Sequence, residues 1–197
     1  MKNLSLSILA LLFFVVDSAR AQNLTAIDPR LNNGFVMTAH QLTVADFKGA
    51  CPKGGNTSDS KMLIAIQALP AKLGYDFKVI PYFSYKSWIV DSLKADPVTL
   101  KKILKHEQNH YDINLLGAAE LKRLLITGHI GRNDVAKRVT ETRDKILQLE
   151  YQVNLRYETD TNYGRDEEQQ QKWNNLLEKA RQSKDFTTLV KYCQNKS

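Results

Sequence analysis

The sequence predicts an α+β protein, in which a small, mainly antiparallel sheet is followed by a helical half that carries an HExxH helix. Residues 22–95 contain short apolar runs, alternating patterns and turn-rich stretches, which are typical of strands. From residue 96 onward the apolar residues recur at helical spacing. The chain has 197 residues with 43% hydrophobic and 25% charged residues, as in a soluble globular protein of one domain.

The N-terminal segment has the three parts of a secretory signal. Lys2 provides the positive charge, residues 4–16 form an apolar run, and Ala-Arg-Ala at 19–21 matches a cleavage site. We therefore expect a signal peptide at 1–21 and a single domain at 22–197, secreted or periplasmic in a bacterial envelope. The apolar run is short for a bilayer span, so we expect no stable membrane insertion after cleavage. The rival interpretation is a short N-terminal membrane anchor.

Charge and cysteine content say less about function. The formal net charge is +7, but the basic residues are scattered and no basic stripe is interleaved with aromatic residues. We therefore expect a basic soluble surface and no nucleic-acid partner. Cys51 and Cys193 are the two cysteines, and the sequence leaves open whether they form a disulfide or remain free thiols. The oligomeric state is also left open.

The strand-rich half contains two recognisable strands after a loop at 50–61, which is rich in Gly, Ser, Pro and Asn. Residues 62–69 form the first candidate strand. In the second, Phe77, Val79, Pro81 and Phe83 share one face at a period of two. Proline has no N–H to donate to a neighbouring strand, so this strand is expected at an edge or bulged at Pro81.

Residues 96–127 predict the clearest helix. Asp96 suits the N-cap, Pro97 the first helical position and Gly128 the C-terminal stop. The residues that recur at helical spacing, and so lie on one face of this helix, are Ile103, His106, His110, Ile113, Gly117, Leu121 and Leu124. Both histidines should therefore point toward the interior.

A second helix is expected from Asn133 or Asp134 to about residue 157, and a third from about 166 to 184, followed by a short C-terminal helix. The connection at 128–134 is short, so the first two helices should be antiparallel neighbours. A hairpin centred there would set His110 opposite Tyr151 and His106 opposite Leu155.

The stretch His106-Glu107-Gln108-Asn109-His110 is an H-E-x-x-H motif. Side chains four apart on a helix lie on one face, and two imidazoles at that spacing can bind one Zn²⁺. A glutamate beside the ligands can act as a general base on an attacking water. The alternative is a pair of ordinary core histidines, but a buried glutamate without a partner is costly and counts against it.

A third ligand must come from another part of the chain. Residue 116, where one zincin class places it, is a leucine, and Glu120 lies too far along the helix. On the expected hairpin, Glu150 lies at the level of the histidines, whereas Glu158 and Asp160 lie just beyond His106. The spacing alone leaves these three carboxylates open.

The sequence resembles a family of predicted secreted zinc-dependent proteases, catalogued as a domain of unknown function in bacterial envelopes. The matching pieces, in order, are QLTVADFKG at 41–49, FSYKSW at 83–88, HEQNHYDI at 106–113 and YETDTNYG at 157–164, followed by Gln170 and Trp173. Asn109 stands where the family usually has Gly, and Tyr163 where it usually has His. The resemblance implies a zincin-like fold and a zinc-dependent peptidase.

The later piece also contains D-x-x-Y-G at 160–164, which is similar to a motif of the aspartate-liganded zincins. That similarity implies Asp160 as the third zinc ligand and Tyr163 as the donor that stabilises the oxyanion. We thus expect a secreted zinc metallopeptidase that acts on a peptide or protein, with zinc on His106, His110 and Asp160. Glu107 would be the general base. The alternative is a non-catalytic envelope binding protein on the same scaffold.

Overall fold

The computed structural model describes residues 9–13, 33–55, 57–72, 74–128, 130 and 134–195. Most of the expected signal segment 1–21 lies outside these residues, and its cleavage stays a prediction. The described part of it is strand β1 (Leu9–Phe13), whose backbone pairs with the sheet, although the sequence predicts a segment outside the domain. None of the described helices is both long and apolar enough to cross a membrane.

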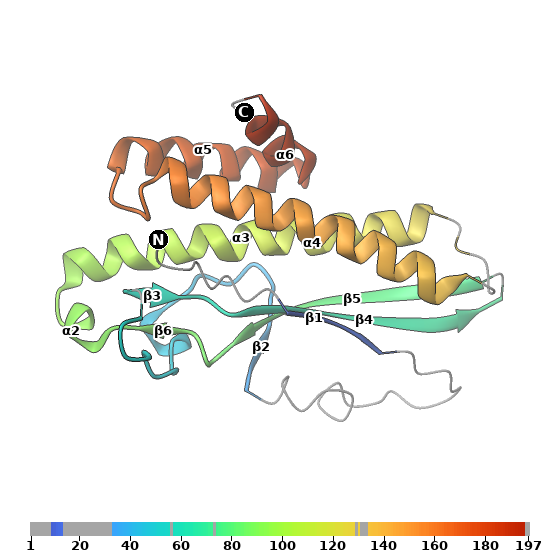
Figure 1. Cartoon of the computed structure of the whole chain (residues 1–197), viewed down its shortest axis with the longest axis horizontal. Coiled ribbons are helices and arrows are strands. Elements are labelled where there is room, and N and C mark those ends of the chain that lie inside the picture. Colours follow the sequence, from blue (N-terminus) through green and yellow to red (C-terminus); the bar gives the residue numbers. More distant parts are fainter. Residues whose placement is uncertain are drawn as a thin grey trace.

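The main sheet has the strand order β1-β4-β5-β2 (Figure 1). Its other strands are β4 (Met62–Ala71), β5 (Gly74–Ser84) and β2 (Gly34–Val36). Strand β1 runs parallel to β4, while β4–β5 and β5–β2 are antiparallel. A second sheet pairs β3 (Ser58–Asp59) with β6 (Trp88–Ile89) in antiparallel orientation. The predicted small, mainly antiparallel sheet is confirmed.

Strand β5 is an edge strand along part of its length. Pro81 pairs with Ile64 of β4 on one side, and its carbonyl accepts a hydrogen bond from the Met37 N–H at 2.8 Å. On the side away from β4, β2 pairs only with residues 82–84 of β5 among the described residues. The expected edge position is therefore correct for residues 74–80 and wrong for the C-terminal end of the strand.

The helical half follows in the order of the chain. It consists of α2 (Asp91–Lys94), α3 (Pro97–Thr127), α4 (Val135–Asp160), α5 (Glu167–Ser183) and α6 (Thr187–Gln194), and a 3₁₀ turn, η2 (Val44–Asp46), precedes it. Figure 1 shows the long α3 lying between the sheet and the pair α5 and α6, while α4 runs obliquely from the sheet at its start to α5 at its end. Helix α3 is therefore covered on both sides, which explains why polar residues on it can be buried.

The predicted helix boundaries are confirmed where capping residues specify them. The Asp96 carboxylate accepts a hydrogen bond from the Val98 N–H at 3.0 Å at the start of α3. At the start of α5, the Asp166 carboxylate likewise accepts a hydrogen bond from the Gln169 N–H at 3.0 Å. Each cap satisfies an N–H group that has no partner within its helix.

The core is built from side chains that the sequence assigned to it. Leu121 and Leu125 of α3 pack with Ile64 and Phe77 of the sheet. On the opposite side of α3, Trp173 of α5 is completely buried. Phe83 and Trp88 are also buried. Cys51 and Cys193 do not form a disulfide with each other, so the sheet half and the C-terminal helix are not joined by one.

The expected register between α3 and α4 is wrong by about one helical turn. His110 contacts Asn154, and His106 contacts Glu158. The residues expected opposite the histidines, Tyr151 and Leu155, are instead 45% and 39% exposed. The register follows the side chains that pair at the interface, Asn154 and Glu158 with the two histidines, and not the midpoint of the connection. Helix α4 also continues through residue 160, beyond the end at about 157 that the turn-forming residues predict. This extension carries a glutamate onto the helix face that meets the histidines.

Candidate metal centre

Two histidines of α3 turn the same ring nitrogen toward one point. The Nε2 atoms of His106 and His110 lie 3.3 Å apart, and the ring centroids are 4.9 Å apart at nearly a right angle. Both residues are buried, because α3 is covered on this side by α4 and α5. The i,i+4 spacing brings the rings together, as the sequence predicts.

Glu158 of α4 completes a group of three donors. Its Oε1 lies 3.1 Å from Nε2 of His110, and its Oε2 lies 3.4 Å from Nε2 of His106. Tetrahedral ligands at about 2.0–2.1 Å from a zinc ion are about 3.3–3.4 Å from each other. The spacing of these donor atoms therefore fits a single metal ion, and all three residues can face it at once.

His110 is held in the tautomer that leaves Nε2 free for a metal. Its Nδ1 lies 2.7 Å from Oδ1 of Asn154. The orientation of that amide is fixed, because Nδ2 of Asn154 donates to the Glu150 carbonyl at 2.9 Å. An amide oxygen can only accept, so Nδ1 of His110 carries the proton. This arrangement of a ring N–H held by a neighbouring acceptor is usual for metal-binding histidines.

His106 is oriented by a second pair of residues. The Tyr157 ring stacks on His106 at 4.8 Å, and the Tyr157 hydroxyl lies 2.8 Å from Nδ1. That hydroxyl donates to Oε1 of Gln170 at 3.0 Å, so it accepts from the imidazole. The Gln170 amide is fixed in turn by donation to Asn174 at 3.2 Å. Burial raises the pKa of Tyr157 well above its ordinary value, so the phenol stays neutral.

The expected third ligand, Asp160, does not join this group. Its carboxylate accepts from Nε of Arg156 at 2.8 Å and from Nε1 of Trp173 at 3.1 Å. Because residue 158 is helical, Asp160 lies about 200° further around α4 and faces α5 instead. Glu158, one of the alternatives left open by the spacing, occupies the position beside the histidines.

The remaining alternative, Glu150, is also absent from the group. It is fully buried against Gly117 of α3, about two helical turns from Glu158. Neither of its carboxyl oxygens has a hydrogen-bond partner among the described residues. Burial raises the pKa of Glu150 well above its ordinary value, because it disfavours the charged form.

The turn after α4 lies against the metal-binding side chains. Gly164 has a positive φ of 76°, and a Cβ there would lie 2.9 Å from Nδ1 of His106. Tyr163, expected to stabilise the oxyanion, has a φ of 58° and a side chain that is 52% exposed. The structure thus places Tyr163 on the surface of a turn whose next residue packs on His106.

Glu107 is buried next to the group, with 3% of its surface exposed. The Ser60 hydroxyl, from the segment between β3 and β4, donates a hydrogen bond to its Oε2. Asp59 also faces this region: burial and then the charge of Glu107 raise the pKa of Asp59 to about 6. A glutamate carboxylate and an aspartate carboxyl therefore lie near the three potential ligands.

The charges of the three donors are coupled. Burial alone lowers the pKa of His110, but the hydrogen bond and charge of Glu158 outweigh burial and raise this pKa to about 9. Burial raises the pKa of Glu158, but the hydrogen bonds and charges of the two histidines outweigh it and hold that pKa well below its ordinary value. Without a metal, an imidazolium thus faces a carboxylate. A divalent cation would replace that proton.

Two residues of the motif have structural roles that sequence reasoning missed. Oε1 of Gln108 accepts from the Leu42 N–H at 2.7 Å, and its Nε2 donates to Asp112 at 2.9 Å. Asp112 also accepts from Arg181 of α5 at 2.9 Å. These contacts connect three parts of the chain: the segment around Leu42, helix α3 and helix α5. The i,i+4 spacing of Gln108 and Asp112 is the one local signal that could have found them.

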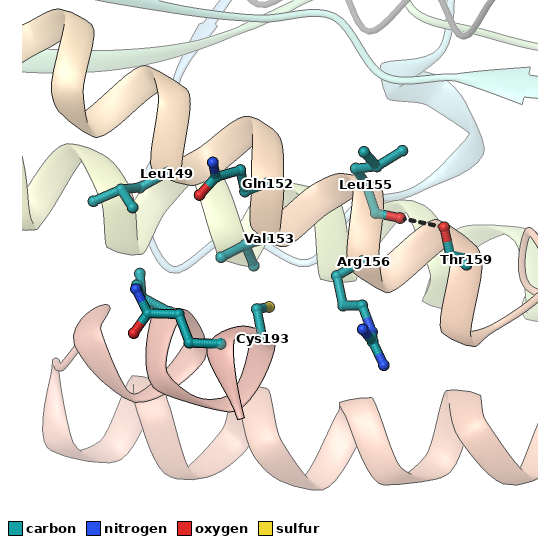
Figure 2. A pocket seen from close by; sticks show the side chains of 9 residues that line it. Leu149, Gln152, Val153, Leu155, Arg156, Thr159 and Cys193 are labelled. Atoms are coloured by element: carbon teal, nitrogen blue, oxygen red, sulfur yellow. Dashed lines mark hydrogen bonds between the residues drawn. The ribbon is translucent and has the colours of Figure 1, made fainter. Parts of the chain in front are cut away.

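A separate pocket lies between α4 and α6, on a side of α4 away from the histidines. Figure 2 shows Leu155, Arg156 and Thr159 along one wall, with Cys193 across from them. Neither histidine nor Glu158 lines this pocket. We therefore assign the metal chemistry to the α3–α4 interface alone.

No family model, curated protein or solved structure matches this chain. The fold and the site together define an α+β protein with a buried cluster of two histidines and a glutamate that could hold a metal ion.

Proposed function

We propose that this protein is a secreted zinc-dependent metallopeptidase, with the metal on His106, His110 and Glu158. The observation that carries the proposal is the convergence of two imidazoles and one carboxylate. The two Nε2 atoms lie 3.3 Å apart, the two oxygens of Glu158 lie 3.1 and 3.4 Å from them, and hydrogen bonds at Nδ1 orient both rings. Three protein ligands leave one coordination position for a water or a substrate, as in catalytic zinc sites.

Zinc is the metal that this donor set fits best. Imidazole nitrogen and carboxylate oxygen are common zinc ligands, and the short spacing fits four-coordinate geometry. When bound, the ion would polarise the substrate carbonyl and make the attacking water more acidic. The three ligands come from rigid helices, so the site is largely formed before the metal binds.

Glu107 is the general base in this proposal. It follows the first ligand directly in the chain and is buried beside the donors, where a carboxylate can take a proton from the attacking water. The same carboxylic acid then gives that proton to the leaving amine, so the base is regenerated when the peptide bond breaks. The substrate is a peptide or protein, and the enzyme acts outside the cytoplasm after removal of 1–21.

The proposal is tested by measuring hydrolysis of a fluorescently labelled unfolded protein by the zinc-loaded chain. Glu107→Gln should lower kcat at least 1,000-fold while the chain still binds one zinc. Glu141→Gln makes the same change on an exposed part of α4 and should leave kcat unchanged. Full activity in Glu107→Gln would overturn the assignment of the base.

A binding protein that holds a metal without catalysis is the second candidate. The exposed position of Tyr163 favours it, because the expected oxyanion donor faces solvent. The buried Glu107 beside the donors favours the peptidase, since a structural metal needs no base. One zinc per chain with no hydrolysis of any of several unfolded proteins would support this second candidate.

A further inference from the structure

The segment between β3 and β4 reaches from the sheet half onto the metal-binding helix. Its central residue, Ser60, donates its hydroxyl proton to Oε2 of Glu107. The two residues are far apart in the sequence and belong to different layers of the fold. The contact therefore depends on how firmly the backbone at Ser60 is held.

The backbone on both sides of Ser60 is anchored. Asp59 pairs with Trp88 in the β3–β6 sheet. The Lys61 N–H donates to Oγ of Ser87 at 2.8 Å, and the Lys61 carbonyl accepts from the Ser84 N–H at 2.8 Å. The backbone on both sides of Ser60 therefore holds its hydroxyl in position to donate to Glu107.

The anchor itself is buried. Ser87 has no exposed surface, and its hydroxyl donates to the Ser84 carbonyl at 2.6 Å while accepting from Lys61. Both functions of this hydroxyl are used, so its position is fixed. These hydrogen bonds therefore fix the backbone of Lys61, next to Ser60, on the turn after β5.

We propose that Ser60 is a positioning residue for the general base. Its hydroxyl donates a hydrogen bond to Oε2 of Glu107. The other carboxyl oxygen, Oε1, is then the one that exchanges a proton with the attacking water. The interaction holds the carboxylate in one rotamer, and misplacing a catalytic group by a fraction of an ångström slows the reaction. The role in catalysis rests on the proposed peptidase function, whereas the hydrogen bond to Glu107 does not.

Kinetics of the zinc-loaded chain test the catalytic part. Ser60→Ala should lower kcat about tenfold, with KM changed less than twofold and one zinc still bound. Ser60→Thr keeps the hydroxyl and should recover kcat to within about threefold. Ser58→Ala, in the adjacent strand β3, should leave kcat unchanged and so controls for a general loosening of β3. An unchanged kcat in Ser60→Ala would overturn the proposal.

A second readout needs no activity. In the metal-free protein, Ser60→Ala and Glu107→Ala, each of which removes one partner of the hydrogen bond, are compared with the double variant by thermal unfolding. If the hydroxyl and the carboxylate interact, the shifts in Tm will not add. Additive shifts would overturn the contact itself. If the wild-type chain binds zinc but hydrolyses nothing, non-additive shifts would keep Ser60 as a partner of Glu107 and reject only the peptidase.

Discussion

Oε1 of Glu158 lies 3.1 Å from Nε2 of His110, across the interface between α4 and α3. Both side chains are buried, with 13% and 7% of their surfaces exposed. A buried pair of opposite charges is costly to form and still more costly to break on one side only. This pair is therefore expected to make both metal binding and stability depend on pH.

In the metal-free protein we expect stability to fall as the solution becomes alkaline. The pKa of His110 is raised to about 9 in the folded state, so its contribution is complete below its ordinary pKa of about 6.5. It is lost as the pH rises through 9. The pKa of Glu158 is lowered, so its contribution is present above its ordinary range and lost in acid.

Denaturant unfolding at several pH values, with a chelator present, measures this effect. Between pH 6.5 and 9 the free energy of unfolding should fall by on the order of 2 kcal/mol more in the wild-type chain than in Glu158→Gln. Identical pH profiles for the two proteins would show that His110 does not gain its proton from Glu158.

Gly164→Ala should weaken metal binding by displacing His106. A Cβ at residue 164 would lie 2.9 Å from Nδ1 of the imidazole, and the φ of 76° adds backbone strain. Gly54 is a matched control, because its φ is 72° and nothing lies within 4 Å of the added Cβ. Both variants should lose about 1 kcal/mol of stability to backbone strain. Only Gly164→Ala should lower zinc affinity, about tenfold or more, by competition with a chromogenic chelator.

Glu150→Met should stabilise the protein at neutral pH. The carboxyl group is buried without a hydrogen-bond partner among the described residues, and methionine fills a similar volume with an apolar side chain. We expect the free energy of unfolding to rise by about 1–2 kcal/mol. A loss of more than 1 kcal/mol would show that the carboxyl group has a stabilising partner, such as a buried water.

Asp59→Asn should change how stability depends on pH in the acid range. The folded-state pKa of Asp59 is raised to about 6, so the folded chain holds this proton more tightly than the unfolded chain. The stability of the metal-free wild-type protein should therefore decrease between pH 4 and pH 6, by about 1 kcal/mol relative to Asp59→Asn. The comparison is made by denaturant unfolding at both pH values. An equal slope in the two proteins would contradict it.

Local sequence patterns predicted the elements that carry the site. Asp96 and Asp166 mark helix starts through caps that need only neighbouring residues, and the spacing of His106 and His110 sets their rings on one face. The α+β order followed from the change in apolar period. These features depend on interactions within a few residues, which a sequence displays directly.

The identity of the third donor, Glu158, could not be predicted from neighbouring residues, because it depends on packing between helices. Turn-forming residues after Tyr157 favoured an early end to α4, but burial of the last turn against α3 and α5 keeps it helical. Because α4 is helical through residue 160, Glu158 lies on the face toward the histidines, and Asp160, two residues further on, is turned about 200° away. The roles of Asn154 and Gln170, which orient the rings, could not be derived from the sequence, because their partners come from another helix; Gln170 entered only as part of the family resemblance.

The most direct test is the zinc affinity of the purified chain and of two matched variants, by chelator competition and metal analysis. We predict one zinc per chain, an affinity at least 100-fold lower in Glu158→Gln, and an affinity within threefold of wild type in Asp160→Asn. A wild-type chain without zinc would contradict the metal centre. Weaker binding in Asp160→Asn but not in Glu158→Gln would contradict the ligand set of His106, His110 and Glu158.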